Sequence, residues 1–170
     1  MGQSEPPILL VGITARMLAE LAVTAGYPVL ALDYFGDADL QALCPNISLR
    51  RDYNQNYSAA TLVDAASDFD APAVIYGASL ENYPAEVARL ARGRRLLGNS
   101  PDTLTRVRDP FLLAEAVRAG GFAFPQTISE AGGSLNGTRP WLWKPRRSGG
   151  GHGIRLWRGE TVDKNGVWQE

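Results

Sequence analysis

The chain has 170 residues, of which 45% are hydrophobic and 21% charged, with a formal net charge of -1. This composition is ordinary for a folded protein of one domain or two small ones, and the near-zero charge excludes a general nucleic-acid or anionic-membrane surface. The single cysteine, Cys44, excludes an internal disulfide framework, and we expect it to be a small buried hydrophobic residue. No signal-peptide pattern and no apolar run of membrane-spanning length occurs, so we expect a cytoplasmic protein.

Short apolar runs alternate with helical segments over the first 98 residues. We expect strands at 8–12, 28–33, 46–49, 71–77 and 94–99. Helical spacing or composition predicts helices at 15–26, 58–67 and 84–92, the first with Thr14 as its N-cap. This β-α-β alternation implies an α/β fold with an open parallel sheet, whose loops at the carboxyl ends of the strands are available for ligands.

The pattern changes after residue 98. Two helix starts follow one another, each a polar N-cap before a proline at the first helical position, at Ser100–Pro101 and Asp109–Pro110. We expect the first helix to end near residue 108 and the second at a glycine pair. An extended segment at 124–129 and turn signals at Gly132–Gly133 and Asn136–Gly137 then lead to the next strand.

A glycine-rich hairpin follows, with the sequence WLWKPRRSGGGHGIRLW over residues 141–157. Alternation on both sides predicts two strands, and a hairpin turn needs fewer glycines than this loop contains. Free backbone N–H groups beside Lys144, Arg146, Arg147 and His152 form an anion cradle that could follow a polyphosphate. The loop matches neither the Walker A motif nor the dinucleotide fingerprint, since it links two strands. A solvated hairpin tip is the alternative.

These segments resemble a known family. KPRRSGGGHGI, preceded by an apolar strand, looks like the glycine-rich loop of ATP-grasp enzymes, and LLGNSPDTLTRVRDPFLLAEAVRAGGFAFPQT resembles the start of their first ATP-binding subdomain. The resemblance covers the whole chain and is most specific at residues 97–157. In particular, the chain is similar to uncharacterised carboligase-like members of this family. It implies a Rossmann-like pre-ATP-grasp domain at 1–98 and a partial ATP-grasp domain at 99–170, with a helical beginning, the glycine-rich hairpin and the start of the adenine hinge.

The resemblance also implies site residues. Lys144 would contact the α- and β-phosphates and the adenine edge, the loop would cover the β- and γ-phosphates, and the last two residues would begin the adenine hinge. The residues expected to bind nucleotide are Lys144, Arg146, Ser148, Gly149, Gly150, Gly151, His152, Gly153, Gln169 and Glu170. Members of the family activate a carboxylate as an acyl phosphate, which an amine or similar nucleophile attacks. Dispersed cations and N–H donors suit such phosphoryl transfer without a covalent protein nucleophile.

Two positions depart from the family pattern. Pro110 stands where many relatives carry a phosphate-binding lysine, so one ATP contact is expected to be missing. The carboxylates and asparagine that hold Mg²⁺ in the family would lie beyond Glu170, and Mg²⁺ is held by carboxylates together with nucleotide phosphates. No catalytic or metal-binding residue is therefore assigned, and we expect this chain by itself not to catalyse.

Loops of the first domain carry other candidates. Asp33 follows Gly12 at about the interval of a dinucleotide-binding carboxylate, but the other glycines of that motif are missing, so a strand-end aspartate that caps its own turn is favoured. We expect the acidic stretch 33–39 to be a solvated loop. The loop at 76–84 would face the acceptor substrate or form a polar turn, and its candidate substrate residues are Ser79, Glu81 and Asn82.

The sequence therefore predicts the ATP-binding portion of an ADP-forming ATP-grasp ligase, with ATP and Mg²⁺ as cofactors. Its partners would be a small-molecule carboxylate and a nucleophile, with no nucleic acid and no membrane, and a homo-oligomer is left open. The alternative is a non-catalytic nucleotide- or metabolite-binding module. A third hypothesis is an NAD-binding oxidoreductase domain.

Overall fold

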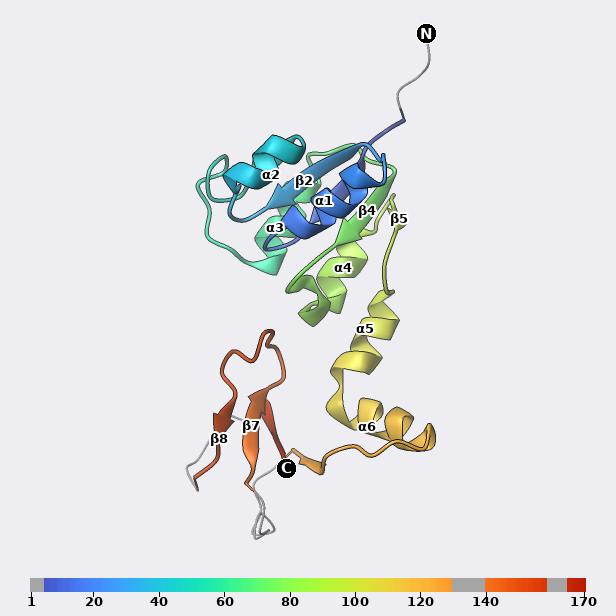
Figure 1. Ribbon diagram of the computed structural model, residues 1–170, viewed down its shortest axis with the longest axis vertical. Coiled ribbons are helices and arrows are strands. Elements are labelled where there is room, and N and C mark those ends of the chain that lie inside the picture. The colour runs from blue at the N-terminus through green and yellow to red at the C-terminus, as the bar shows by residue number, and fades with distance from the viewer. Residues whose placement is uncertain (1–4, 130–139, 159–164) are drawn as a thin grey trace. The chain divides into compact units, whose positions relative to one another are not determined.

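The computed structural model describes residues 5–129, 140–158 and 165–170 (Figure 1). The turns predicted at Gly132–Gly133 and Asn136–Gly137 lie outside these residues. The chain divides into two compact units, Met1–Leu104 and Thr105–Glu170. Within the described part of the chain, no helix is long and apolar enough to cross a membrane.

A parallel sheet organises the first unit. Its five strands lie in the order β3-β2-β1-β4-β5, with Leu9 of the central strand opposite Leu30 on one side and Val74 on the other. The strands are β1 (Ile8–Val11), β2 (Val29–Asp33), β3 (Asn46–Ser48), β4 (Ala73–Tyr76) and β5 (Arg95–Leu96). The central strand β1 is apolar throughout, and β2 is apolar up to Asp33 at its end, as is typical of parallel strands whose two faces are both covered. The open parallel sheet predicted from the sequence is confirmed.

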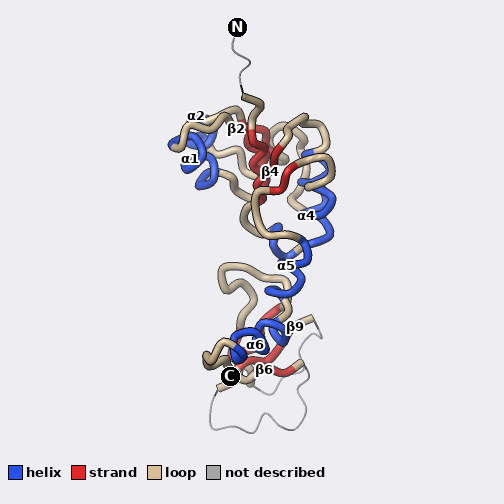
Figure 2. Tube along the Cα trace, turned by 90° about the vertical axis from the view of Figure 1, so that its right-hand side faces the viewer, coloured by secondary structure: helices blue, strands red, loops and turns tan. Residues whose placement is uncertain are grey.

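Helices cover both faces of this sheet (Figure 2). Leu10 points to the side of α1 and α2, whereas its neighbour Leu9 points to the side of α3 and α4, since successive strand residues face opposite ways. The helices are α1 (Arg16–Thr24), α2 (Ala38–Leu43), α3 (Ala59–Ala66) and α4 (Pro84–Leu90), with a 3₁₀ turn η1 (Leu80–Asn82) before α4. Each face therefore has its own hydrophobic core.

Two local expectations for this unit were wrong. Thr14 does not cap α1: the helix begins at Arg16, and the N–H of Ala15 is held by a carboxylate oxygen of Asp33 at 3.3 Å. The stretch 33–39 is not solvated along its whole length, because α2 begins within it and Asp33 is fully buried. The six residues of α2 bury one leucine, too short a pattern for the sequence to predict.

The two helix starts after residue 98 are confirmed. Ser100 Oγ accepts a hydrogen bond from the N–H of Thr103 at 3.2 Å, at the start of α5 (Pro101–Arg108). Asp109 Oδ1 accepts from the N–H groups of Phe111 at 2.8 Å and Leu112 at 3.2 Å, at the start of α6 (Pro110–Ala119). Proline at the first helical position lacks the N–H that would otherwise be unsatisfied there. The Asp109 cap lies at the corner between α5 and α6.

A second sheet, of antiparallel strand pairs, completes the second unit. Its order is β6-β9-β7-β8, and the extended segment and strands predicted around residues 124–129, 141–144 and 154–157 are confirmed with small shifts of their ends. The strands are β6 (Thr127–Ile128), β7 (Leu142–Pro145), β8 (Arg155–Leu156) and β9 (Gly166–Gln169). Trp143 lies opposite Trp168, and with Trp141 they form the buried cluster of this sheet.

Candidate functional site

The glycine-rich loop, residues 146–154, connects β7 and β8 (Figure 1). Gly150, Gly151 and Gly153 have φ angles of 59°, 78° and 74°, a left-handed conformation that other L residues rarely adopt. A Cβ added at Gly150 or Gly151 would meet no atom within 4 Å. Glycine is thus required there by backbone conformation and not by crowding, and open space lies beside the backbone.

Five of the nine backbone amides of this loop donate no hydrogen bond to a described residue. The His152 N–H donates within the loop to Gly149 O at 3.1 Å and the Ile154 N–H to Gly151 O at 3.2 Å, while the Arg146 N–H donates to Asn165 O at 2.9 Å. No hydrogen bond to any described residue is donated by the amides of Ser148, Gly149, Gly150, Gly151 and Gly153. A run of exposed, unpaired N–H groups in left-handed and turn conformations is the geometry of an anion-binding concavity.

Lys144 lies on β7, where strand alternation turns it away from the tryptophan cluster. Its amino group donates to the side-chain oxygen of Gln169 on β9, and the Gln169 amide donates to Thr127 Oγ1 at 3.1 Å. The structure therefore brings together two of the predicted site residues, Lys144 and Gln169, from different strands. Glu170 donates its backbone N–H to Gln126 O at 3.0 Å, which fixes the backbone at this predicted hinge position.

Two arginines beside the loop, Arg146 and Arg155, lie over aromatic rings. The Arg146 guanidinium lies 5.6 Å from the ring centroid of Phe111 on α6, and the Arg155 guanidinium lies 4.7 Å from that of Trp143. Such cation–π contacts fix the position of a guanidinium while leaving its charge in place. His152 is exposed, and its carbonyl oxygen accepts a hydrogen bond from Ser148 Oγ, so these two predicted loop residues also meet.

Arg108 could not be identified as a site residue from the sequence. This residue ends α5, and its Nη2 donates to Ser148 O at 2.8 Å and to Arg146 O at 3.4 Å. These contacts join residues 40 and 38 positions apart, so no local pattern could have identified them. Phe111 was missed for the same reason.

A separate polar cluster lies at the carboxyl end of β4, in the first unit. Ser79 has a φ of 77°, and its hydroxyl is hydrogen-bonded to the hydroxyl of Tyr57. The Asn82 amide donates to Ser79 O at 3.2 Å and to a Glu81 carboxylate oxygen at 3.3 Å. The predicted substrate residues Ser79, Glu81 and Asn82 are thus one hydrogen-bonded turn, with Tyr57 as a member that the sequence did not indicate. Burial raises the pKa of the Tyr57 phenol above its usual value.

Asp33 supports the fold rather than a ligand. The side chain is fully buried, and its two oxygens accept from the N–H groups of Gly36 at 2.9 Å and Ala15 at 3.3 Å. The interpretation as a strand-end aspartate that caps its turn is confirmed. Burial raises the pKa of this carboxyl, and the two backbone hydrogen bonds oppose that effect.

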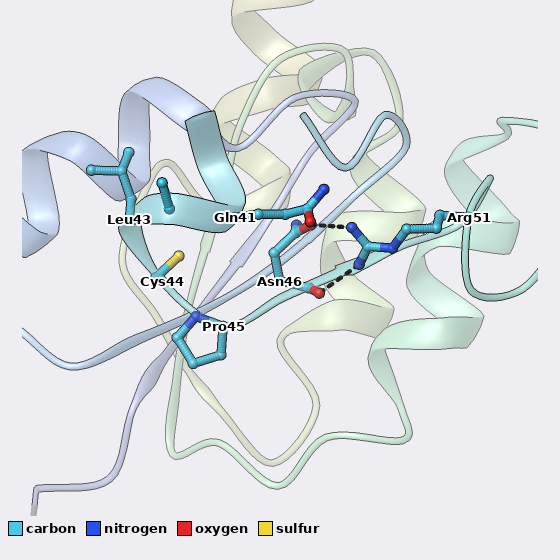
Figure 3. A pocket seen from close by; sticks show the side chains of 7 residues that line it. Gln41, Leu43, Cys44, Pro45, Asn46 and Arg51 are labelled. Carbon is cyan, nitrogen blue, oxygen red and sulfur yellow. Dashed lines mark hydrogen bonds between the residues drawn. The ribbon is translucent and has the colours of Figure 1, made fainter. Parts of the chain in front are cut away.

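A hollow of about 470 Å³ between α2 and β3 has its polar groups already paired (Figure 3). The Arg51 guanidinium donates to Asn46 Oδ1 at 3.3 Å and to Asn46 O at 2.8 Å, and it also binds Asp52 at 2.7 Å. Cys44 in its wall is 9% exposed, and burial raises the pKa of its thiol. The expectation that Cys44 is a buried hydrophobic residue is confirmed.

Comparison with known proteins places the fold. No protein-family model matches the sequence, and no curated protein does. Among solved structures, Rhizobium etli pyruvate carboxylase with the activator acetyl coenzyme A matches with a TM-score of 0.70 and 16% identity over 97% of this chain and 18% of its own. Staphylococcus aureus N5-carboxyaminoimidazole synthetase complexed with ADP matches with a TM-score of 0.66 and 17% identity over 99% of this chain and 48% of its own.

A third match is the biotin carboxylase domain dimer of the Hydrogenobacter thermophilus 2-oxoglutarate carboxylase, solved with MgADP and bicarbonate. Its TM-score is 0.59 at 21% identity, over 91% of this chain and 38% of its own. The chain therefore spans less than half the length of each of these proteins. All three are ATP-grasp enzymes, and the predicted fold, that of their N-terminal portion, is confirmed.

Proposed function

We propose that this chain is the ATP-binding N-terminal portion of an ADP-forming ATP-grasp ligase. Residues 1–98 would be the pre-ATP-grasp domain, and residues 99–170 would be the first part of the ATP-grasp domain. The complete protein would activate a carboxylate as an acyl phosphate for attack by an amine or a similar nucleophile. The turn of Ser79, Glu81 and Asn82 would then contribute to binding one of these small molecules.

One observation carries the proposal: the unpaired amides of the glycine-rich loop, on a hairpin whose first strand bears Lys144. Phosphate oxygens accept hydrogen bonds from backbone N–H groups at no cost in side-chain entropy, and a lysine adds a point charge. The residues that would hold ATP are Lys144, Arg146, Ser148, Gly149, Gly150, Gly151, His152, Gly153, Gln169 and Glu170. When bound, ATP would supply the phosphoryl group that these donors orient and whose developing charge they stabilise.

Two of the solved structures of the same fold hold ADP or MgADP. The open space beside Gly150 and Gly151 suits the close approach of phosphates to backbone. Magnesium is different: among the described residues, no group of three His, Cys, Asp or Glu side chains could hold a metal ion.

Calorimetric titration with ATP tests the assignment. Lys144→Met keeps the apolar stem and removes the charge, and loss of a charged contact of about 1.5–3 kcal/mol weakens binding roughly 10- to 150-fold. Arg106→Ala is the matched control: the Arg106 side chain is exposed on α5 and forms no hydrogen bond, ion pair or ring contact with a described residue, so this variant should bind ATP as the wild type does. Equal affinity of Lys144→Met and the wild type would refute the role of Lys144, and no ATP binding at all would refute the proposal.

The native protein from its source cells separates the ligase from a non-catalytic binding module. An intact mass well above the 18.4 kDa of this chain, together with ADP release that depends on added carboxylate and amine, supports the ligase. Hydroxylamine serves as a general nucleophile in that assay because it traps acyl phosphates as hydroxamates. ATP binding without ADP release under all of these conditions would support the module.

A further inference from the structure

Arg108 lies where α5 ends and turns into α6. Its side chain is half-buried, and its Nη2 donates to the carbonyl oxygens of Ser148 and Arg146 in the glycine-rich loop, at 2.8 Å and 3.4 Å. Hydrogen bonds from a charged donor are stronger than those between neutral groups. The Arg106 side chain on the same helix is exposed and forms no hydrogen bond, ion pair or ring contact with a described residue, so the contact of Arg108 with the loop is specific to its position.

The contact fixes the direction of the loop amides. A trans peptide unit is planar, with its C=O and N–H pointing in opposite directions, and none of the described peptide bonds is cis. Ser148 O and the N–H of Gly149 belong to one peptide unit, and Arg146 O and the N–H of Arg147 belong to another. Holding the two oxygens toward Arg108 therefore turns these two N–H groups to the opposite side.

The loop needs such a constraint because glycine loses more conformational freedom on ordering than any other residue. Its glycines fill no tight space at Gly150 or Gly151, so packing does not order them. A second contact acts at the same corner, since the Arg146 guanidinium lies 5.6 Å over the ring of Phe111. The N-cap of α6, Asp109, holds the N–H of Phe111 and so fixes that residue.

We propose that Arg108 is a positioning residue, which holds the carbonyl side of the glycine-rich loop and so presents the amide side to the phosphates of a nucleotide. It acts through the loop and does not itself touch the nucleotide. The inference rests on the proposed nucleotide site for its ligand. It adds a residue outside the loop that determines the affinity of the site for phosphate groups.

Binding of ATP and of adenosine, which has no phosphates, tests the proposal by calorimetry. Arg108→Ala should weaken ATP binding about tenfold, equivalent to about 1.4 kcal/mol, and leave adenosine binding within twofold of the wild type. Arg108→Lys should recover part of the loss, because an ammonium group can still donate to one of the two oxygens. Arg106→Ala, which removes the same charge from the same helix, should change neither affinity.

A second readout needs no nucleotide. Trypsin cleaves after Arg147, and an ordered loop resists this cleavage. Loss of the Arg108 contact should lower the free energy of local opening, so trypsin should cut Arg108→Ala at this bond about tenfold faster than the wild type. Cleavage at the wild-type rate would overturn the proposal, as would equal loss of ATP and adenosine affinity, which is the pattern of general damage. If Arg108→Ala does not fold, Arg108→Lys carries both tests.

The two proposals fail separately. Wild-type protein that binds ATP while Arg108→Ala binds it equally well would overturn the role of Arg108 and leave the nucleotide site standing. Wild-type protein without ATP affinity would overturn the nucleotide site. The rate of cleavage after Arg147 would then decide by itself whether Arg108 orders the loop.

Discussion

Gly166, the first residue of β9, is required by the tryptophan that it contacts. A Cβ at this position would lie 2.4 Å from Trp143 Cε2 and 2.5 Å from its Nε1, where real Cβ atoms stay beyond 3.0 Å. The indole has little room to move, because it is 8% exposed, lies opposite Trp168 and has the Arg155 guanidinium over its ring. Inserting a methyl group into a packed core costs about 1–3 kcal/mol, so Gly166→Ala should lower the free energy of unfolding of the second unit by about 2 kcal/mol.

Urea denaturation followed by tryptophan fluorescence measures this loss. All of the tryptophans lie in the second unit, so the signal reports on that unit alone; they are Trp141, Trp143, Trp157 and Trp168. A double-mutant cycle isolates the clash: with Trp143→Leu, the smaller side chain leaves room, and Gly166→Ala should cost less than about 0.5 kcal/mol. A loss below about 0.5 kcal/mol in the wild type, or an equal loss in both backgrounds, would refute the steric explanation.

Two further predictions concern the first unit. Ser58→Ala removes the N-cap of α3, whose hydroxyl accepts from Thr61 N–H at 3.0 Å, and should cost about 1 kcal/mol of unfolding free energy by far-UV circular dichroism in urea; an unchanged midpoint would contradict it. Burial raises the pKa of Asp33, so the native state binds the proton of this carboxyl more tightly than the unfolded state does. The contribution of Asp33 to the free energy of unfolding therefore falls as pH rises from the pKa of the unfolded state, near 3.8, through the pKa of the folded state. The free energy of unfolding of the wild type minus that of Asp33→Asn should therefore decrease over this range, and a flat or rising difference would argue against the buried carboxyl.

The parts of the fold that the sequence predicted are those with local signals. Asp109–Pro110 specifies a helix start with atoms of neighbouring residues, and the cap forms as expected. The apolar runs of the parallel sheet are equally local. The start of α1 is not, because its first turn is held by Asp33, which lies 18 residues beyond Ala15. Threonine is a common helix cap, but the N–H of Ala15 is bound by the buried carboxylate of Asp33 at the end of β2 and not by Thr14.

The same division applies to the candidate site. The glycines, Lys144 and the hairpin form were predicted, because strand alternation and glycine content are visible over a few residues. Arg108 and Phe111 were not, since each contacts the loop across more than thirty intervening residues and neither stands out from other helix residues. Tyr57 was missed in the same way, because its partner Ser79 lies 22 residues further along the chain, in the loop after β4.

Glycine is required in this hairpin and in the neighbouring strand β9 for opposite physical reasons, and the sequence alone does not show which reason applies at which glycine. Gly166 is a glycine because Trp143 occupies the place of its Cβ, whereas Gly150 and Gly151 have nothing within 4 Å of theirs. A glycine in a crowded position, such as Gly166, indicates tight packing and nothing about a ligand. A loop that used glycine only to reverse the chain would pair its amides internally, as His152 and Ile154 do. Gly150 and Gly151 are left-handed and lie in open space, their amides donate to no described residue, and the nearby carbonyls of Ser148 and Arg146 are held by Arg108; this arrangement supports the proposed ligand, one that accepts hydrogen bonds.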